Sequence, residues 1–174
     1  MWFASCWDEQ SVDFIDEFNP PCYKIASASI TDRGLLNHTA AKGKPLIIST
    51  GMSTMEEIRE AIMIVEKHIG NQYVILHCTS TYPCPLGEIN LNVIRALRNK
   101  YNIPIGYSGH ETGLVPTMAA VAIGACIIER HITLDRGMYG SDQAASLEEA
   151  GLKRMIRDVR AVEKMKKKKE EETK

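Results

Sequence analysis

The sequence predicts an α/β fold, namely an incomplete (β/α)8 TIM barrel of about six strand-helix units. Short β-rich runs alternate with stretches of helical apolar spacing, which indicates parallel strands joined by helices. Six such units can be counted in the 174 residues, whereas a closed barrel needs eight units and about 250 residues. Polar side chains follow nearly every run, as the carboxyl-end face of a barrel requires. An open doubly wound sheet is the alternative, but it would gather its polar groups at one switch point.

The strands are predicted from the β-rich runs, and the helices from apolar residues that recur with the period of an α-helix. We expect strands at 2–5, 23–27, 45–50, 73–78, 103–108 and 126–133. We expect helices at 12–18, 35–42, 55–68, 89–100, 115–125 and 152–165. Two helix starts have the spacing of a capping box, with Ser53 three residues before Glu56 and Ser146 three before Glu149.

Composition and charge exclude several classes of function. The formal net charge of −1 gives no reason to expect a nucleic-acid partner. No apolar run approaches the roughly 18 residues of a membrane span, and no signal segment opens the chain, so we expect a cytoplasmic protein with no membrane role. The five cysteines are scattered without a CxxC pair, and we expect reduced thiols.

The chain divides into one domain and a tail. Residues 1–164 carry the strand and helix patterns and are predicted to form the partial barrel. Residues 165–174, MKKKKEEETK, are a block of like charges followed by its opposite. Such a segment cannot bury apolar area, so we expect a fraying helix end or disorder.

Two histidines stand just past neighbouring strand-like runs. His110 follows the run in IGYSGHETG, and His131 lies in CIIERHITLD. Because the carboxyl ends of barrel strands meet on one rim, we expect the two imidazoles to lie together. His77, within YVILHC, could equally be a hydrogen-bonded core histidine and is left out of this site.

Six ordered blocks extend the argument beyond fold class. The chain from about Phe3 to about Met165 resembles the barrel domain of the sialic acid synthases through KIASASITD, GKPLIISTGMSTMEEI, LHCTSTYPCPLGEINL, IPIGYSGHETG, AAVAIGACIIERHITLD and GSDQAASLE. The resemblance implies an enzyme that condenses phosphoenolpyruvate with N-acetylmannosamine or a related amino sugar. The product would be a nine-carbon 2-keto acid, formed with release of phosphate. Which amino sugar is the acceptor stays open.

The resemblance also implies roles for individual residues. His110 and His131 would bind a divalent metal, Mn²⁺ or Mg²⁺, which suits imidazole together with oxygen ligands. The catalytic set would be these two histidines with Asp142, which would contact the sugar hydroxyls. The substrate-binding residues would be Lys24, Ser27, Ser49 and Ser108 for the phosphate and carboxylate of phosphoenolpyruvate, and Ser80 and Tyr82 for the sugar.

Relatives in this family carry two earlier strand-helix units and a C-terminal antifreeze-like domain, and the sequence resembles neither. We therefore expect a barrel truncated at both ends, which leaves two hypotheses beside an independently active enzyme. The chain could be an inactive fragment, or one half of a split synthase completed by a chain that supplies the missing strands. A homodimer could also repair the exposed edges. A different reaction, that of another metal-dependent TIM-barrel aldolase, would need no phosphate pocket.

Overall fold

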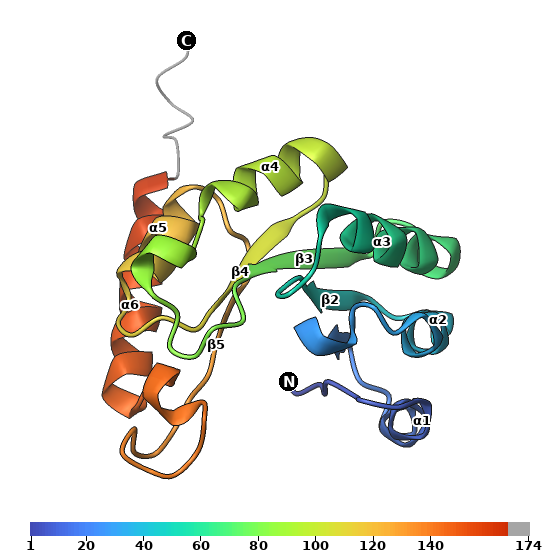
Figure 1. Cartoon of the computed structure of the whole chain (residues 1–174), viewed down its shortest axis with the longest axis horizontal. Coiled ribbons are helices and arrows are strands. Elements are labelled where there is room, and N and C mark those ends of the chain that lie inside the picture. Colours follow the sequence, from blue (N-terminus) through green and yellow to red (C-terminus); the bar gives the residue numbers. More distant parts are fainter. Residues whose placement is uncertain (167–174) are drawn as a thin grey trace.

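The computed structural model describes residues 1–166 and contains one five-stranded parallel sheet in the order β1-β2-β3-β4-β5. The sheet curls into a half-barrel with helices on its outer side (Figure 1). The predicted incomplete TIM barrel is thus confirmed. The strands are β1 (Tyr23–Ile25), β2 (Leu46–Ser49), β3 (Tyr73–Cys78), β4 (Ile105–Gly109) and β5 (Ile128–Arg130).

The strand predicted at 2–5 is wrong. Ser5 makes only an isolated parallel bridge to Lys24, in which the Lys24 N–H donates to the Ala4 carbonyl. The chain then turns at once into α1, because the Asp8 side chain caps that helix by accepting from the Ser11 N–H. A segment that leaves the sheet so soon cannot form the further ladder bonds of a strand.

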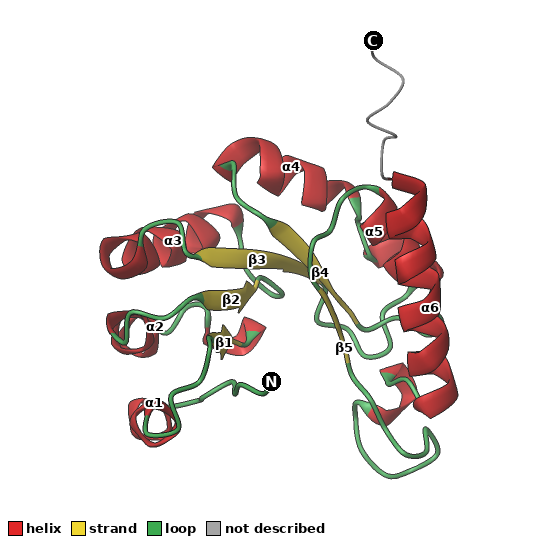
Figure 2. Ribbon diagram, turned by 180° about the vertical axis from the view of Figure 1, so that it is seen from behind, coloured by secondary structure: helices red, strands yellow, loops and turns green. Residues whose placement is uncertain are grey.

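All six predicted helices are present, with ends that differ by a few residues. They are α1 (Glu9–Asp16), α2 (Arg33–Ala41), α3 (Met55–Ile69), α4 (Asn92–Tyr101), α5 (Val115–Ala122) and α6 (Glu149–Lys166). The helices cover the convex face of the curled sheet (Figure 2). Residues 165 and 166 continue α6, and the rest of the predicted tail lies outside the described residues.

Both predicted capping boxes are wrong. The cap of α3 is displaced by one residue, because the Thr54 side chain accepts from the Glu57 N–H while the Glu57 carboxylate accepts from the Thr54 N–H. The hydroxyl of Ser146 instead donates to the Asp142 carbonyl at 2.8 Å, and α6 begins only at Glu149.

Alternation along the strands separates core from pocket. Ile25, Ile48, Ile75 and Ile105 pair in register across four strands and belong to the buried core beneath the helices. Their neighbours in sequence point to the concave face, since successive side chains of a strand alternate. On that face Cys78, Ser108 and Glu129 form one row across β3, β4 and β5.

His77 is the core histidine that the sequence allowed. It is buried, and its Nε2 donates to the Ile89 carbonyl at 2.6 Å on the helix side of β3.

Among residues 1–166, no helix combines the length and apolar character that crossing a membrane would require.

Candidate active site

One cavity lies over the carboxyl ends of the strands and contains every residue predicted for the site. Its volume is about 500 Å³. The predicted residues that line it are Lys24, Ser27, Ser49, Ser80, Tyr82, Ser108, His110, His131 and Asp142. They come from all five strand ends and the loops that follow, so the half-barrel alone brings this whole set together.

Lys24 lines the cavity, and its buried side chain contacts the hydroxyl of Ser49. Its Nζ donates to Ser49 Oγ at 2.8 Å and to the Ile25 carbonyl at 3.0 Å. Burial lowers the pKa of Lys24, although the nearby Glu129 carboxylate opposes that shift. A buried ammonium among hydroxyl donors is a suitable receptor for a phosphate or carboxylate group.

Glu129 joins this cluster and was not assigned to the site from the sequence. Its Oε1 accepts from Ser108 Oγ at 2.7 Å and from Ser49 Oγ at 3.4 Å, and its Oε2 lies 3.6 Å from Lys24 Nζ. The signal that could have found it is its spacing, because Glu129 precedes His131 by two residues in the predicted strand 126–133, which places both side chains on one face.

A second group of polar side chains surrounds Cys78. Its Sγ lies 3.4 Å from Ser27 Oγ and 3.8 Å from Ser80 Oγ. Gly51 allows these loops to meet: its N–H donates to Ser27 Oγ at 3.0 Å, and a Cβ there would lie 2.1 Å from Ser80 Oγ. The glycine is therefore required for the close approach of two predicted substrate-binding serines.

The two histidines lie together, with Tyr82 beside both. The ring centroids of His110 and His131 are 5.1 Å apart, and the Tyr82 ring lies 4.0 Å from His110 and 5.5 Å from His131. Asp142 places its Oδ2 3.6 Å from His131 Nδ1. Burial and the neighbouring His110 both lower the pKa of His131, while Asp142 opposes them.

A hydrogen bond sets the orientation of His110. Its Nδ1 donates to the Thr79 carbonyl at 2.8 Å, since a carbonyl can only accept, and Nε2 is left as the ring nitrogen that could bind a cation. Burial alone would lower the pKa of His110, but its contacts with Cys78 and the Thr79 carbonyl outweigh burial and raise it.

The donor set fits a divalent cation only as an open site. Residues 1–166 contain no group of three or more His, Cys, Asp or Glu side chains disposed to hold a metal ion. His110 and His131 could supply two imidazole nitrogens, and water or substrate oxygens would have to complete the coordination, as in catalytic sites that keep open positions.

A buried ion pair connects the two strand ends that carry the histidines. Arg130 donates to Glu111 Oε1 at 3.0 Å, and the side chains of Arg130 and Glu111 are 1% and 0% exposed. Glu111 also accepts from Tyr107 and Thr117 hydroxyls at 2.8 and 2.9 Å. Because Glu111 follows His110 and Arg130 precedes His131, this ion pair joins the two chain segments that carry the histidines.

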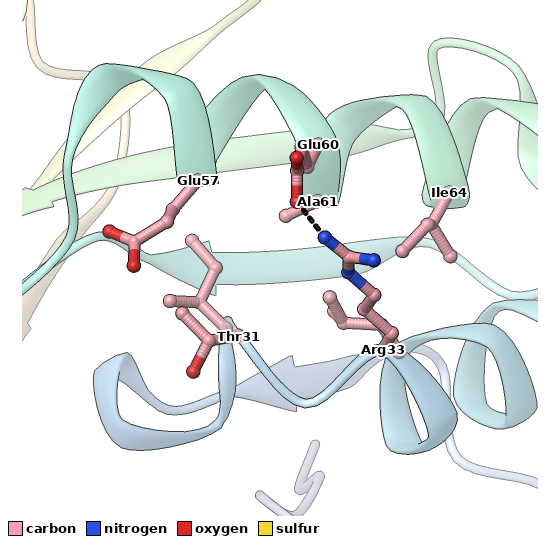
Figure 3. A pocket seen from close by; sticks show the side chains of 8 residues that line it. Thr31, Arg33, Glu57, Glu60, Ala61 and Ile64 are labelled. Atoms are coloured by element: carbon pink, nitrogen blue, oxygen red, sulfur yellow. Dashed lines mark hydrogen bonds and ion pairs between the residues drawn. The ribbon is translucent and has the colours of Figure 1, made fainter.

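A separate cavity of about 130 Å³ lies between α2 and α3, away from the strand ends (Figure 3). Arg33 donates to Glu60 across it, as the dashed line in Figure 3 marks. None of the residues predicted for the site lines this second cavity.

Comparisons with known proteins bear on the family and the fold of the chain. The model of the NeuB family matches residues 1–171. The chain is 45% identical over 161 residues to human N-acetylneuraminate-9-phosphate synthase, covering 92% of this chain and 45% of that protein. It is 41% identical over 167 residues to N,N'-diacetyllegionaminic acid synthase from Legionella pneumophila, covering 93% of this chain and 47% of that protein.

Among solved structures, N-acetylneuraminic acid (sialic acid) synthetase from Leptospira borgpetersenii in complex with citrate superposes with a TM-score of 0.92 and 34% identity. The match covers the whole of this chain and 61% of that one. The chain thus spans about half the length of the curated relatives it matches.

Proposed function

Since the chain belongs to the NeuB family, we propose that its cavity serves the condensation of phosphoenolpyruvate with an N-acetylated amino sugar such as N-acetylmannosamine. In that reaction the C3 carbon of phosphoenolpyruvate bonds to the aldehyde carbon of the open-chain sugar. Water adds to C2, the C–O bond to phosphate breaks, and a nine-carbon 2-keto acid and inorganic phosphate are released. The observation that carries the proposal is the convergence of Lys24, Ser49 and Ser108 beside the paired histidines.

Each group of side chains has a task in this reaction. Lys24, Ser27, Ser49 and Ser108 would bind the phosphate and carboxylate of phosphoenolpyruvate through charge-assisted hydrogen bonds. The residues that would hold the sugar are the hydroxyl of Ser80, the ring of Tyr82 and the carboxylate of Asp142, which line the same cavity. The two substrates would then meet with their reacting carbons in a fixed orientation, which is itself a large source of rate acceleration.

His110 and His131 would hold a divalent cation, Mn²⁺ or Mg²⁺. When bound, such a cation supplies Lewis acidity toward the sugar aldehyde. The protein's own contribution is orientation, because the Thr79 carbonyl fixes the ring of His110 and Asp142 lies beside Nδ1 of His131. Asp142 can accept the Nδ1 proton of His131 in a hydrogen bond once the ring turns slightly, which would favour Nε2 as the metal-binding nitrogen.

The reaction is tested by phosphate release from phosphoenolpyruvate in the presence of Mn²⁺ and N-acetylmannosamine. We expect His110→Ala and His131→Ala to abolish release while circular dichroism remains that of the folded protein. We expect Lys24→Ala to weaken the apparent affinity for phosphoenolpyruvate by at least about tenfold, since it removes a charged hydrogen-bond donor. An unchanged affinity in Lys24→Ala would favour another metal-dependent aldolase reaction, which needs no phosphate pocket.

The sheet edges support an assembly as the active form. Within residues 1–166, β1 and β5 each have one strand neighbour, supplemented by single bridges at Ser5–Lys24 and Ile132–Leu147. Open parallel edges favour pairing with another chain. We therefore propose a homodimer, or a complex with a chain that contributes further strands. A folded monomer that releases phosphate alone would refute this, and a folded chain without activity would direct the search to a companion chain.

A further inference from the structure

We propose that Glu129 occupies the position of the substrate's anionic group and competes with that group for Lys24, Ser49 and Ser108. This inference rests on the proposed function, in which those three side chains bind phosphoenolpyruvate. It assigns a role in anion selection to Glu129, a residue that the sequence analysis did not place in the site.

The hydrogen bonds carry the first step. The Ser108 hydroxyl donates its proton to Glu129 Oε1 at 2.7 Å, and the Ser49 hydroxyl, which accepts from Lys24, directs its own proton to the same oxygen at 3.4 Å. A hydroxyl has one proton to donate. A phosphate or carboxylate oxygen that accepts a hydrogen bond from either serine must therefore replace Glu129 as the acceptor of that bond.

Charge carries the second step. Glu129 Oε2 lies 3.6 Å from Lys24 Nζ and balances the charge of that lysine. The other cation that lines the cavity, Arg130, is committed to a buried pair with Glu111. An incoming anion thus meets a lysine that already has a counter-charge, and it is repelled by the carboxylate at close range.

Exposure identifies which partner can move. The Lys24 side chain is 9% exposed, whereas that of Glu129 is 38% exposed. Glu129 can therefore turn further into the cavity while Lys24 stays in place. Glu129 keeps the buried ammonium paired and both serines oriented, and an anion that makes few other contacts gains too little to displace it.

The test compares the wild-type chain with Glu129→Gln by isothermal titration calorimetry, using inorganic phosphate and phosphoenolpyruvate as probes. The glutamine carbonyl can still accept from Ser108, so the variant removes charge and keeps the shape of the cluster. We expect the dissociation constant for both probes to fall by about tenfold, the effect of relieving one close like-charge contact. Glu88→Gln, which removes the same charge from an exposed residue at the end of a short 3-10 helix, should leave both constants within about twofold.

Glu129→Ala is a second variant that also removes the carboxylate and should shift binding in the same direction. Binding that is unchanged or weaker in both variants, with thermal unfolding like that of the wild type, overturns the competition. Phosphate binding that appears only in the variants supports it, and no binding in any of the proteins counts against it. Lys24→Ala separates the two levels of argument: wild-type phosphate binding that survives Lys24→Ala refutes the pocket assignment itself, whatever Glu129 does.

Discussion

Replacing Glu111 by glutamine would test how strongly the ion pair behind the two histidines stabilises the fold. Glu111 is fully buried, and Arg130 directs its guanidinium to the Glu111 carboxylate and to the Glu111 and Gly113 carbonyls. Glutamine keeps the size of the side chain but leaves the Arg130 charge without a counter-charge in the interior. Breaking a buried pair in this way costs about 3–5 kcal/mol.

Urea unfolding followed by circular dichroism measures this cost. With a slope of about 2 kcal/mol per molar urea for a domain of this size, the midpoint of Glu111→Gln should fall by about 2 M. The matched control is Glu149→Gln, which breaks the exposed pair with Lys153 and should change stability by at most about 0.5 kcal/mol. A loss below about 1 kcal/mol in Glu111→Gln would refute the reasoning.

The stability of a domain is about 5–15 kcal/mol, so Glu111→Gln could be unfolded in part even without urea. A double variant, Glu111→Gln with Arg130→Met, addresses this case because it removes the buried charge together with its partner. We expect it to be more stable than Glu111→Gln alone, since an unpaired buried charge costs more than an absent pair. Equal or lower stability of the double variant would show that the charge of Arg130 is not the cause.

Two further predictions concern close packing and titration. Gly51→Ala should lose about 1–3 kcal/mol of stability in urea unfolding, because its Cβ would lie 2.1 Å from Ser80 Oγ. It should also weaken phosphoenolpyruvate binding, because the same Cβ would lie 2.8 Å from Ser27 Oγ; full stability would mean that the two loops adjust easily. Burial, and then the hydrogen bond to Glu66, raise the pKa of Tyr73. The native state therefore holds the phenol proton more tightly than the unfolded chain, and the free energy of unfolding should fall as pH rises above about 10. Tyr73→Phe should reduce that fall, and an identical pH profile would contradict the assignment.

The sequence was sufficient to predict the fold class, because the apolar residues recur with the period of a strand and of a helix in turn, and this alternation depends only on local sequence. It failed where two local patterns were equally good. Ser53 and Thr54 are both hydroxyl residues, and each stands three residues before a glutamate, so only the backbone of the folded chain decides that Thr54 caps α3. Residues 2–5 have a β-rich composition, yet a strand forms only where several consecutive residues can pair with the neighbouring strand, here β1.

The site shows the same division between local and long-range information. Strand periodicity already places Glu129 and His131 on one face, so the presence of a carboxylate in the cavity could have been predicted. The partners of Glu129 could not have been predicted, because they depend on how the strands pair. The register places Ser108 of β4 opposite Glu129 of β5, whereas Lys24 lies on β1, two strands away from β3. A glutamate that the sequence places beside a histidine is thus, through the register and curvature of the sheet, the counter-charge of the predicted anion site.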